Sequence, residues 1–333
     1  MVETEKFKKI LTPYLNLEGI DFVAIVNFVG TLVYNESSSD YIKSEENLNK
    51  LIKSVMETIT DKYNAGSLYT DNQRIVFVKA GTHAIVITYI QPTVSLDAVF
   101  PYAYVIAEKV SRTFDNRPVL PIMPDFGKIV TTVQPKKPTG PKGFFLFSKA
   151  TPEQNTFSFK MVIGGEFAVG KTSLVHTFIT GKFDQDAGYK ATIGTSILKK
   201  ECELANFDIA VNLVIWDLGG QEQFAQVRSK YMKDAKAGFL VFDVTRPETF
   251  DKIPKWVEDF KSSADSSLEL FLIGNKIDLK EERKITTEQG MDLAKSLGLP
   301  YLETSALNSD IVDEAFQLIA FKLVKDKINL TES

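Results

Sequence analysis

The segment that decides the fold of the C-terminal half is MVIGGEFAVGKTSL, residues 161–174. It satisfies the pattern G-x-x-x-x-G-K-[ST] with Gly165, Gly170, Lys171 and Thr172. The apolar, β-prone run FSFKMVI precedes the pattern, and SLVHTFIT, which can continue as a helix, follows it. Strand, glycine-rich loop and helix in this order predict a loop that binds phosphate groups, hereafter the P-loop (residues 165–172).

The P-loop residues suit nucleotide phosphates. The two outer glycines let successive backbone N–H groups face inward, at a helix start whose dipole attracts anions. Lys171 is expected to bridge the β and γ phosphates, and the Thr172 hydroxyl to coordinate Mg²⁺. The alternative is a glycine-rich turn with an incidental lysine. The residues expected to bind nucleotide here are Gly165, Glu166, Phe167, Ala168, Val169, Gly170, Lys171, Thr172 and Ser173.

Composition bounds the class of protein. A chain of 333 residues with 44% hydrophobic residues and 24 Phe can bury two cores. With a net charge of −4, the chain lacks the overall positive charge that would indicate binding to nucleic acid or to an anionic membrane. The single cysteine, Cys202, excludes an intramolecular disulfide, indicates a reducing cytoplasmic setting and is expected in a buried strand.

Membrane signals are not found in the printed sequence. No apolar run approaches 18 residues, and the first residues do not resemble a signal peptide. Residue 2 is not Gly and the final KINLTES contains no Cys, so sites for myristoylation and prenylation are not expected. We therefore expect a cytoplasmic protein that partners recruit to membranes.

A proline-rich stretch divides the chain. Seven of the 13 prolines fall within residues 115–155, where they disfavour helix and favour extended chain. Inside this stretch, FGKIVTTV (residues 126–133) could form a strand that packs on either domain. The predicted division is a first domain over residues 1–115, a linker over 116–155, a second domain over 156–328 and a tail over 329–333.

The first domain is predicted to be a small α+β domain with an antiparallel sheet of five strands. The expected helices cover residues 5–15, 44–63 and 98–114. The expected strands cover residues 22–27, 31–34, 67–69, 74–79 and 83–90, with a turn at Gly30. No cluster of Cys, His or paired carboxylates offers chemistry in this half of the sequence, and His83 is interpreted as structural.

The order of these elements and the run GIDFVAIVNFVGTLVY (residues 19–34) resemble the roadblock (LC7) family, with the longin fold as the alternative. The resemblance implies a platform that dimerises or binds similar domains. A small open sheet agrees with that role, because it leaves an edge or an apolar helix face to be covered.

Further motifs in the second domain complete a nucleotide site. The run VNLVIWDLGGQE (residues 211–222) places a carboxylate and glycines after an apolar strand, where Mg²⁺ and the γ-phosphate lie in nucleotide-binding sheets. Asp217 is expected to hold Mg²⁺ through water, and the Gly220 N–H to meet the γ-phosphate. Gln221 is expected to orient the attacking water.

The next strands supply the base specificity. LELFLIG leads into Asn275, Lys276 and Asp278, and a carboxylate there can accept two hydrogen bonds from the guanine edge that adenine does not offer. YLETSAL then brings Ser305, Ala306 and Leu307 after another strand, where a backbone N–H can donate to guanine O6. The motifs therefore predict GTP or GDP as the ligand, and they disfavour an ATP-using enzyme.

Over residues 156–327 the chain resembles the Ras superfamily of small GTPases, which implies a P-loop α/β fold with a mostly parallel sheet and helices on both faces. YKATIG and FLVFDVT resemble Rab proteins, whereas WDLGGQ, with Gly219, resembles the Arf and Roc branches. The combined architecture resembles archaeal chimeric small GTPases. The implied catalytic residues are Gln221, Lys171 and Thr192, and the implied Mg²⁺ ligands are Thr172, Thr192 and Asp217.

Two functions remain open. Thr192, Asp217 and Gln221 favour a GTP-hydrolysing switch that binds effectors and regulators. Phe167 and the absence of a lipidation motif favour a guanine-nucleotide-binding platform with negligible turnover. In Ras-like loops Gly is common at the position of Phe167, beside the γ-phosphate, so a phenyl ring there predicts slow intrinsic hydrolysis unless the ring folds away.

Overall fold

The computed structural model describes residues 2–37, 45–59, 63–70, 73–91, 93–119, 121, 123, 144–148, 156–184, 195–204, 209–220, 225–264, 267–325 and 330–332. The chain divides into two compact units. Unit 1 comprises Met1–Asn155, Ala205–Ile209 and Lys325–Ser333, and unit 2 comprises Thr156–Leu204 and Ala210–Val324. Among the helices in the described ranges, none has the length and apolar character needed to cross a membrane.

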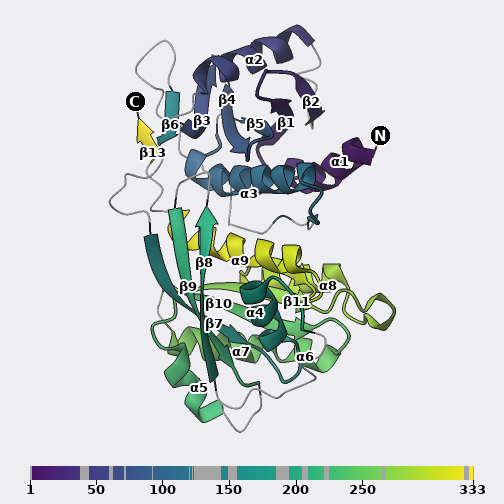
Figure 1. The fold of residues 1–333 in the computed structure, drawn as a ribbon, viewed down its shortest axis with the longest axis vertical. Helices are drawn as coiled ribbons and strands as arrows, with labels where there is room; N and C mark the ends of the chain where they lie inside the picture. The colour runs from purple at the N-terminus through teal and green to yellow at the C-terminus, as the bar shows by residue number, and fades with distance from the viewer. Residues whose placement is uncertain are drawn as a thin grey trace. The chain divides into compact units, whose positions relative to one another are not determined.

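Unit 1 is an α+β unit with an antiparallel sheet, as expected (Figure 1). Its helices are α1 (Val2–Leu15), α2 (Glu45–Thr58) and α3 (Leu96–Phe114). Its strands are β1 (Ile20–Asn27), β2 (Leu32–Ser37), β3 (Tyr63–Thr70), β4 (Gln73–Ala80), β5 (Ala84–Ile90), β6 (Phe144–Ser148) and β13 (Leu330–Glu332). The strand order is β13-β6-β3-β4-β5-β1-β2, and every neighbouring pair is antiparallel.

Helices cover both faces of this sheet. Side chains alternate along a strand, so Phe22, Ala24 and Val26 of β1 share one face, where they pack in a cluster with α2. Contacts of α3 with β4 and β5, and of α1 with α3, cover the other face. Figure 1 shows α2 and α3 on opposite sides of the strands. Burial on both faces explains why every residue of β5 except Thr88 is hydrophobic.

Two expectations for this half were wrong. The helix predicted over residues 44–63 ends at Thr58, and Tyr63, an aromatic residue that favours strands, begins β3. The sheet also has two strands beyond the predicted five, because β6 pairs with β3 and β13 pairs with β6. The apolar run FFLFS of β6 was missed because it lies within the proline-rich stretch that was predicted to be a linker. A short extended segment such as this one can pair with an open sheet edge. The strand considered over residues 126–133 lies outside the described residues.

Unit 2 is built on a six-stranded sheet of order β12-β11-β10-β7-β9-β8. Its strands are β7 (Thr156–Gly164), β8 (Thr195–Leu204), β9 (Ile209–Leu218), β10 (Ala237–Asp243), β11 (Glu269–Asn275) and β12 (Tyr301–Thr304). Its helices are α4 (Lys171–Thr180), α5 (Ala225–Met232), α6 (Pro247–Asp251), α7 (Ile253–Ser263), the 3₁₀ turn η4 (Lys280–Glu282), α8 (Thr287–Leu297) and α9 (Ser309–Val324).

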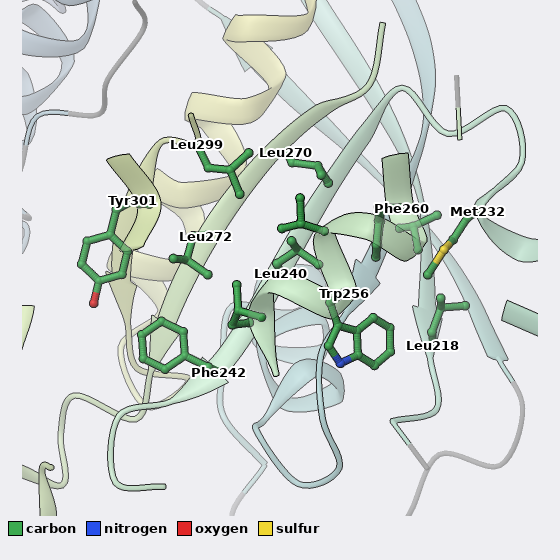
Figure 2. Close-up of a cluster of buried hydrophobic side chains, with 14 of the residues drawn as sticks. Leu218, Met232, Leu240, Phe242, Trp256, Phe260, Leu270, Leu272, Leu299 and Tyr301 are labelled. Carbon is green, nitrogen blue, oxygen red and sulfur yellow. The ribbon is translucent and has the colours of Figure 1, made fainter. Parts of the chain in front are cut away.

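The pairs β9–β7, β7–β10, β10–β11 and β11–β12 are parallel. One face packs on α5, α7 and α8 through a cluster that includes Met232, Trp256, Phe260 and Ala294 (Figure 2). The other face packs on α4 and α9, and the rings of Phe178 and Phe316 stack 3.8 Å apart between these helices. This confirms the expected α/β architecture with helices on both faces of a mostly parallel sheet.

The parallel pairing places the functional loops. The carboxyl ends of β7, β9, β10, β11 and β12 lie at one edge of the sheet, because these strands run in the same direction. Residues 165–170, 219–220, 244–246, 276–278 and 305–307 directly follow these ends. Five short segments that are distant in sequence therefore meet at one edge.

Candidate nucleotide-binding site

The P-loop backbone requires glycine at both ends. Gly165 has φ +135° and Gly170 has φ +95°, which are conformations that side chains disfavour. A Cβ atom at Gly165 would lie 2.1 Å from the carbonyl oxygen of Val241, so the loop also passes too close to β10 for any side chain. Ala168 is left-handed as well, with φ +61°, which is uncommon for a non-glycine residue.

A cation and two oxygen ligands meet at the helix start. The ammonium of Lys171, only 6% exposed, donates to the carbonyl oxygens of Gly165 and Glu166 at 2.8 and 2.7 Å. The hydroxyl of Thr172 donates to Oδ2 of Asp217, which is buried at the end of β9, at 2.5 Å. A hydroxyl and a carboxylate are the hard oxygen ligands that Mg²⁺ accepts, with phosphate and water completing its shell. The residues present therefore fit a Mg²⁺–phosphate complex.

The segment after β9 runs against the P-loop. A Cβ atom at Gly220 would lie 2.6 Å from the backbone of Glu166 and of Phe167. Only glycine fits this position, because any side chain would collide with the backbone of the P-loop. The two remaining predicted catalytic residues, Thr192 and Gln221, lie outside the described residues.

Asn275 connects the P-loop to the base-recognition motifs. Its amide Nδ2 donates to the carbonyl oxygen of Val169 at 2.8 Å, and its Oδ1 accepts from Thr304 Oγ1 at 3.0 Å. The side chain thus joins the P-loop, the end of β11 and the end of β12. Thr304 was not among the predicted residues, although its position directly before Ser305 at the end of β12 is a signal for it.

The residues predicted to recognise guanine lie together. The hydroxyl of Ser305 donates to Oδ1 of Asp278 at 2.5 Å, and the N–H of Leu307 donates to the Ser305 hydroxyl at 3.2 Å. The carbonyl oxygen of Ala306 accepts from Thr177 of α4 at 2.9 Å, which ties this loop to the helix that follows the P-loop. Ser305 and Ala306 are buried, whereas Asp278 and Leu307 are exposed and accessible to a base.

Lys276 is held by a buried carboxylate. It has the left-handed φ of +68°, and its ammonium forms an ion pair with Oδ2 of Asp243 at 2.6 Å. Oδ1 of Asp243 accepts from the N–H and the hydroxyl of Thr245 at 2.9 and 2.7 Å. Sequence reasoning missed Asp243 as a site residue, although a carboxylate that ends an apolar strand is the signal that identified Asp217.

Two other contacts to the P-loop carried no sequence signal. The indole N–H of Trp256 in α7 donates to Oε1 of Glu166 at 3.0 Å, across 90 residues of chain. Nη1 of Arg246 donates to the carbonyl oxygen of Phe167 at 3.0 Å, across 79 residues. Phe167 is 38% exposed, and Ser173 is half-buried in the first turn of α4.

Two further observations concern ionisable groups. Among the described residues, no group of three or more His, Cys, Asp or Glu could hold a metal ion by itself. Cys202 is buried in β8, as expected, and burial raises the pKa of its thiol to about 12. A thiol in that state stays protonated and unreactive at neutral pH.

Comparisons with known proteins agree with this geometry. The model of the Ras family matches residues 160–325. The chain is 39% identical over 163 residues to the Ras-related protein RABA4b of Arabidopsis thaliana, which covers 49% of this chain and 71% of that protein. It is 37% identical over 174 residues to the Ras-related protein Rab11D of Nicotiana tabacum, which covers 51% of this chain and 77% of that protein.

These relatives match the same segment that contains the P-loop, the paired Thr172 and Asp217, and the residues predicted to recognise guanine. The chain belongs to the Ras family, and its C-terminal half is a Rab-like small GTPase that binds GTP or GDP with Mg²⁺ and hydrolyses GTP.

Proposed function

We propose that the whole chain is a GTP-driven molecular switch whose N-terminal half is a fused partner-binding domain. The observation that supports a switch is that four side chains meet at the P-loop, namely those of Lys171, Thr172, Asp217 and Asn275. Such a site distinguishes GTP from GDP, because the γ-phosphate can order the neighbouring segments and hydrolysis releases them.

The residue roles follow from chemistry. Thr172, Thr192 and Asp217 serve Mg²⁺, with Asp217 acting through water. Lys171 bridges the β and γ phosphates, the Gly220 N–H donates to the γ-phosphate, and Gln221 orients the attacking water. Asn275 stabilises the P-loop, while Asp278 selects guanine. The remaining nucleotide contacts in this proposal are Lys276, Ser305, Ala306 and Leu307.

A platform with negligible turnover is the second candidate, and Phe167 is the observation that favours it. Its ring is partly exposed, and the backbone of Phe167 lies where a Cβ at Gly220 would collide. A ring at this place can occupy the space that Gln221 needs. In GTPases whose activating protein supplies an arginine finger, that finger contributes about 10³ to 10⁵ in rate, so blocking its approach would outweigh a packing gain.

Multiple-turnover phosphate release from the purified chain separates the two candidates. A switch releases phosphate continuously with GTP and Mg²⁺, and the Gln221→Leu variant does not. A platform binds GTP but releases less than one equivalent of phosphate over hours. Chelation of Mg²⁺ is expected to abolish release and to accelerate nucleotide dissociation.

The N-terminal unit is proposed to be a roadblock-type domain, with longin as the alternative. The supporting observations are the order α1-β1-β2-α2-β3-β4-β5-α3 and the helices on both faces of its sheet. Four large apolar residues are exposed around the β1–β2 hairpin and edge strand β2, namely Phe28, Val29, Leu32 and Val33. Exposed apolar residues beside a sheet edge suit pairing with a similar domain.

Sedimentation of the whole chain tests this part. Self-association that depends on concentration, and that Val33→Glu weakens, is expected for a dimerising platform. A strict monomer at high micromolar concentration would contradict it. The whole chain is preferable to residues 1–114, because that fragment lacks β6 and leaves β3 as an open edge.

The domain division proposed from sequence is part of the same hypothesis: residues 1–115, a linker over 116–155, the GTPase over 156–328 and a tail over 329–333. The predicted linker and tail also contain β6 and β13, which pair in the sheet of unit 1. A fragment that starts at residue 156 is expected to bind GTP as tightly as the whole chain. A cytoplasmic location, with membrane recruitment through a partner, is also proposed, and the single cysteine supports it.

A further inference from the structure

Arg246 contacts the P-loop from a neighbouring strand. It follows the end of β10 and precedes α6, which begins at Pro247. Its Nη1 donates to the carbonyl oxygen of Phe167 at 3.0 Å, and its Nε donates to Oε1 of Glu248 at 2.9 Å. The hydrogen bond from Arg246 also lowers the pKa of the Glu248 carboxyl, so the pair stays ionised at neutral pH. Two partners therefore orient the guanidinium.

The Phe167 carbonyl differs from the carbonyls before it. Those of Gly165 and Glu166 accept from the buried ammonium of Lys171, whereas that of Phe167 accepts from the partly exposed Arg246. No cis peptide bond occurs among the described residues, and in a trans peptide the C=O and the N–H point in opposite directions. The N–H of Ala168 therefore points away from Arg246.

The P-loop has a second peptide held in the same way. Asn275, at the end of β11, donates to the carbonyl oxygen of Val169 at 2.8 Å. Strands β10 and β11 are parallel neighbours whose last residues, Asp243 and Asn275, are paired, and Arg246 lies three residues after Asp243. The carbonyls of residues 167 and 169 are thus both held from outside the loop, which fixes the peptides that carry the N–H groups of Ala168 and Gly170.

We propose that Arg246 is a positioning residue for phosphate binding, which holds and polarises the peptide between Phe167 and Ala168 so that the Ala168 N–H donates to the nucleotide. A charged donor on a carbonyl oxygen makes the N–H of the same peptide a stronger donor. It also supports the left-handed Ala168, whose backbone conformation is costly for a non-glycine residue. This role rests on the nucleotide binding described above and extends it to a residue outside the sequence motifs.

The competing explanation is that Arg246 only forms a surface ion pair with Glu248. The Arg246 side chain is 35% exposed and that of Glu248 is 66% exposed. Ion pairs with that exposure contribute little to stability. In that case removal of the guanidinium would leave the P-loop and its ligand affinity unchanged.

The experiment compares Arg246→Ala, Arg246→Lys and a control, Lys255→Ala, in the full chain. Lys255 is exposed on α7, so its substitution makes the same change in net charge without touching the P-loop. The measurements are the dissociation constant of a fluorescent GDP analogue and the ¹H–¹⁵N resonance of Ala168 in the GDP-bound protein.

For Arg246→Ala we expect about tenfold weaker GDP binding, as for loss of one charged hydrogen bond. The Ala168 proton is expected to move upfield because its N–H becomes a weaker donor. Arg246→Lys keeps a charged donor and should recover part of both effects, while Lys255→Ala should match the parent protein. Recovery of GDP affinity and of the Ala168 resonance in Arg246→Lys would show that a charged donor at residue 246 positions the peptide. Misfolding of Arg246→Ala would not explain that recovery.

Two results would overturn the proposal. One is an Arg246→Ala variant with the affinity and the Ala168 resonance of the control. The other is weaker binding with an unmoved Ala168 resonance, because the effect would then bypass the peptide. Absence of GDP binding in the parent protein would instead contradict the GTPase assignment itself, so the two failures are distinguishable.

Discussion

The two units use similar helices and strands but place polar groups differently. In unit 2 the buried side chains of Asp217, Asp243, Asn275 and Thr304 all stand at the carboxyl ends of parallel strands, and each is at most 1% exposed. In unit 1 a buried polar pair such as Tyr14 and Thr88, 2.9 Å apart, joins α1 to the middle of β5. One arrangement builds a ligand site, and the other holds a helix on a sheet.

Strand direction explains the difference. Carboxyl ends of parallel strands meet at one edge, so residues that follow different strands converge there. Carboxyl ends of antiparallel strands alternate between two edges, and residues that follow them are dispersed. Buried polar groups need hydrogen-bond partners. In unit 2 the residues that meet at one edge of the sheet are partners for one another, and the remaining polar groups there can bind a ligand. If the two units keep these separate roles, a change in the core of one should leave the other unaffected.

The largest expected effect belongs to Asp278→Asn. Each of two charged hydrogen bonds to guanine contributes about 1.5 to 3 kcal/mol, so GTP affinity is expected to fall by about 10² to 10⁴-fold. Xanthosine triphosphate should become the better ligand, because its carbonyl accepts from the new amide. Competition binding measures this, and Asp292→Asn on the exposed surface of α8 is the control. Equal GTP and ATP affinity in the parent chain would contradict guanine selection.

Phe77→Ala tests whether a change in the core of unit 1 leaves nucleotide binding by unit 2 unaffected. Phe77 is fully buried in the cluster that α2 covers, so its truncation is expected to cost about 3 to 5 kcal/mol of folding free energy. Thermal unfolding should show this loss in the transition of unit 1, with GDP affinity unchanged. Phe260→Ala, in the core of unit 2, is the matched variant and should weaken GDP binding. Loss of GDP binding in Phe77→Ala would refute the separation of the units.

Phe167→Gly addresses the P-loop alone. If the ring obstructs Gln221, its removal is expected to raise single-turnover GTP hydrolysis about tenfold, with GTP affinity changed less than twofold. The backbone contact to Arg246 does not depend on this side chain, so the change leaves that contact in place. Gln221→Leu should abolish hydrolysis in either background. An unchanged or slower rate in Phe167→Gly would show that the ring is no obstacle.

The smallest expected effect is that of Thr286→Ala at the start of α8. The Thr286 hydroxyl accepts from the N–H of Gln289 at 3.2 Å, and the Gln289 side chain accepts from the N–H of Thr286 at 2.8 Å. Removal of such a cap costs about 1 kcal/mol. The melting temperature of unit 2 should fall by a few degrees, and Thr286→Ser should restore it. A change in unit 1 would again contradict separate units.

Much of unit 2 could be predicted because its signals are local. Gly165, Lys171 and Thr172 lie within one loop, and Asp217, Asn275 and Asp278 each follow an apolar run that predicts a strand. Unit 1 was harder, since β6 is a five-residue run inside a proline-rich stretch and its pairing partner β3 lies 74 to 85 residues away in the chain. No local pattern distinguishes such a segment from linker.

The sequence by itself determined the phosphate loop, the choice of guanine and the α/β order, because spacing and residue chemistry within short windows carry that information. Only the tertiary structure decided which outside groups hold the P-loop. Arg246, Trp256 and Asn275 reach it across 79, 90 and 106 residues, and an arginine or a tryptophan in sequence carries no mark of such a contact. The reason is physical: parallel strand pairing creates these neighbours, and the polar atoms that meet there acquire a role only after the sheet has formed.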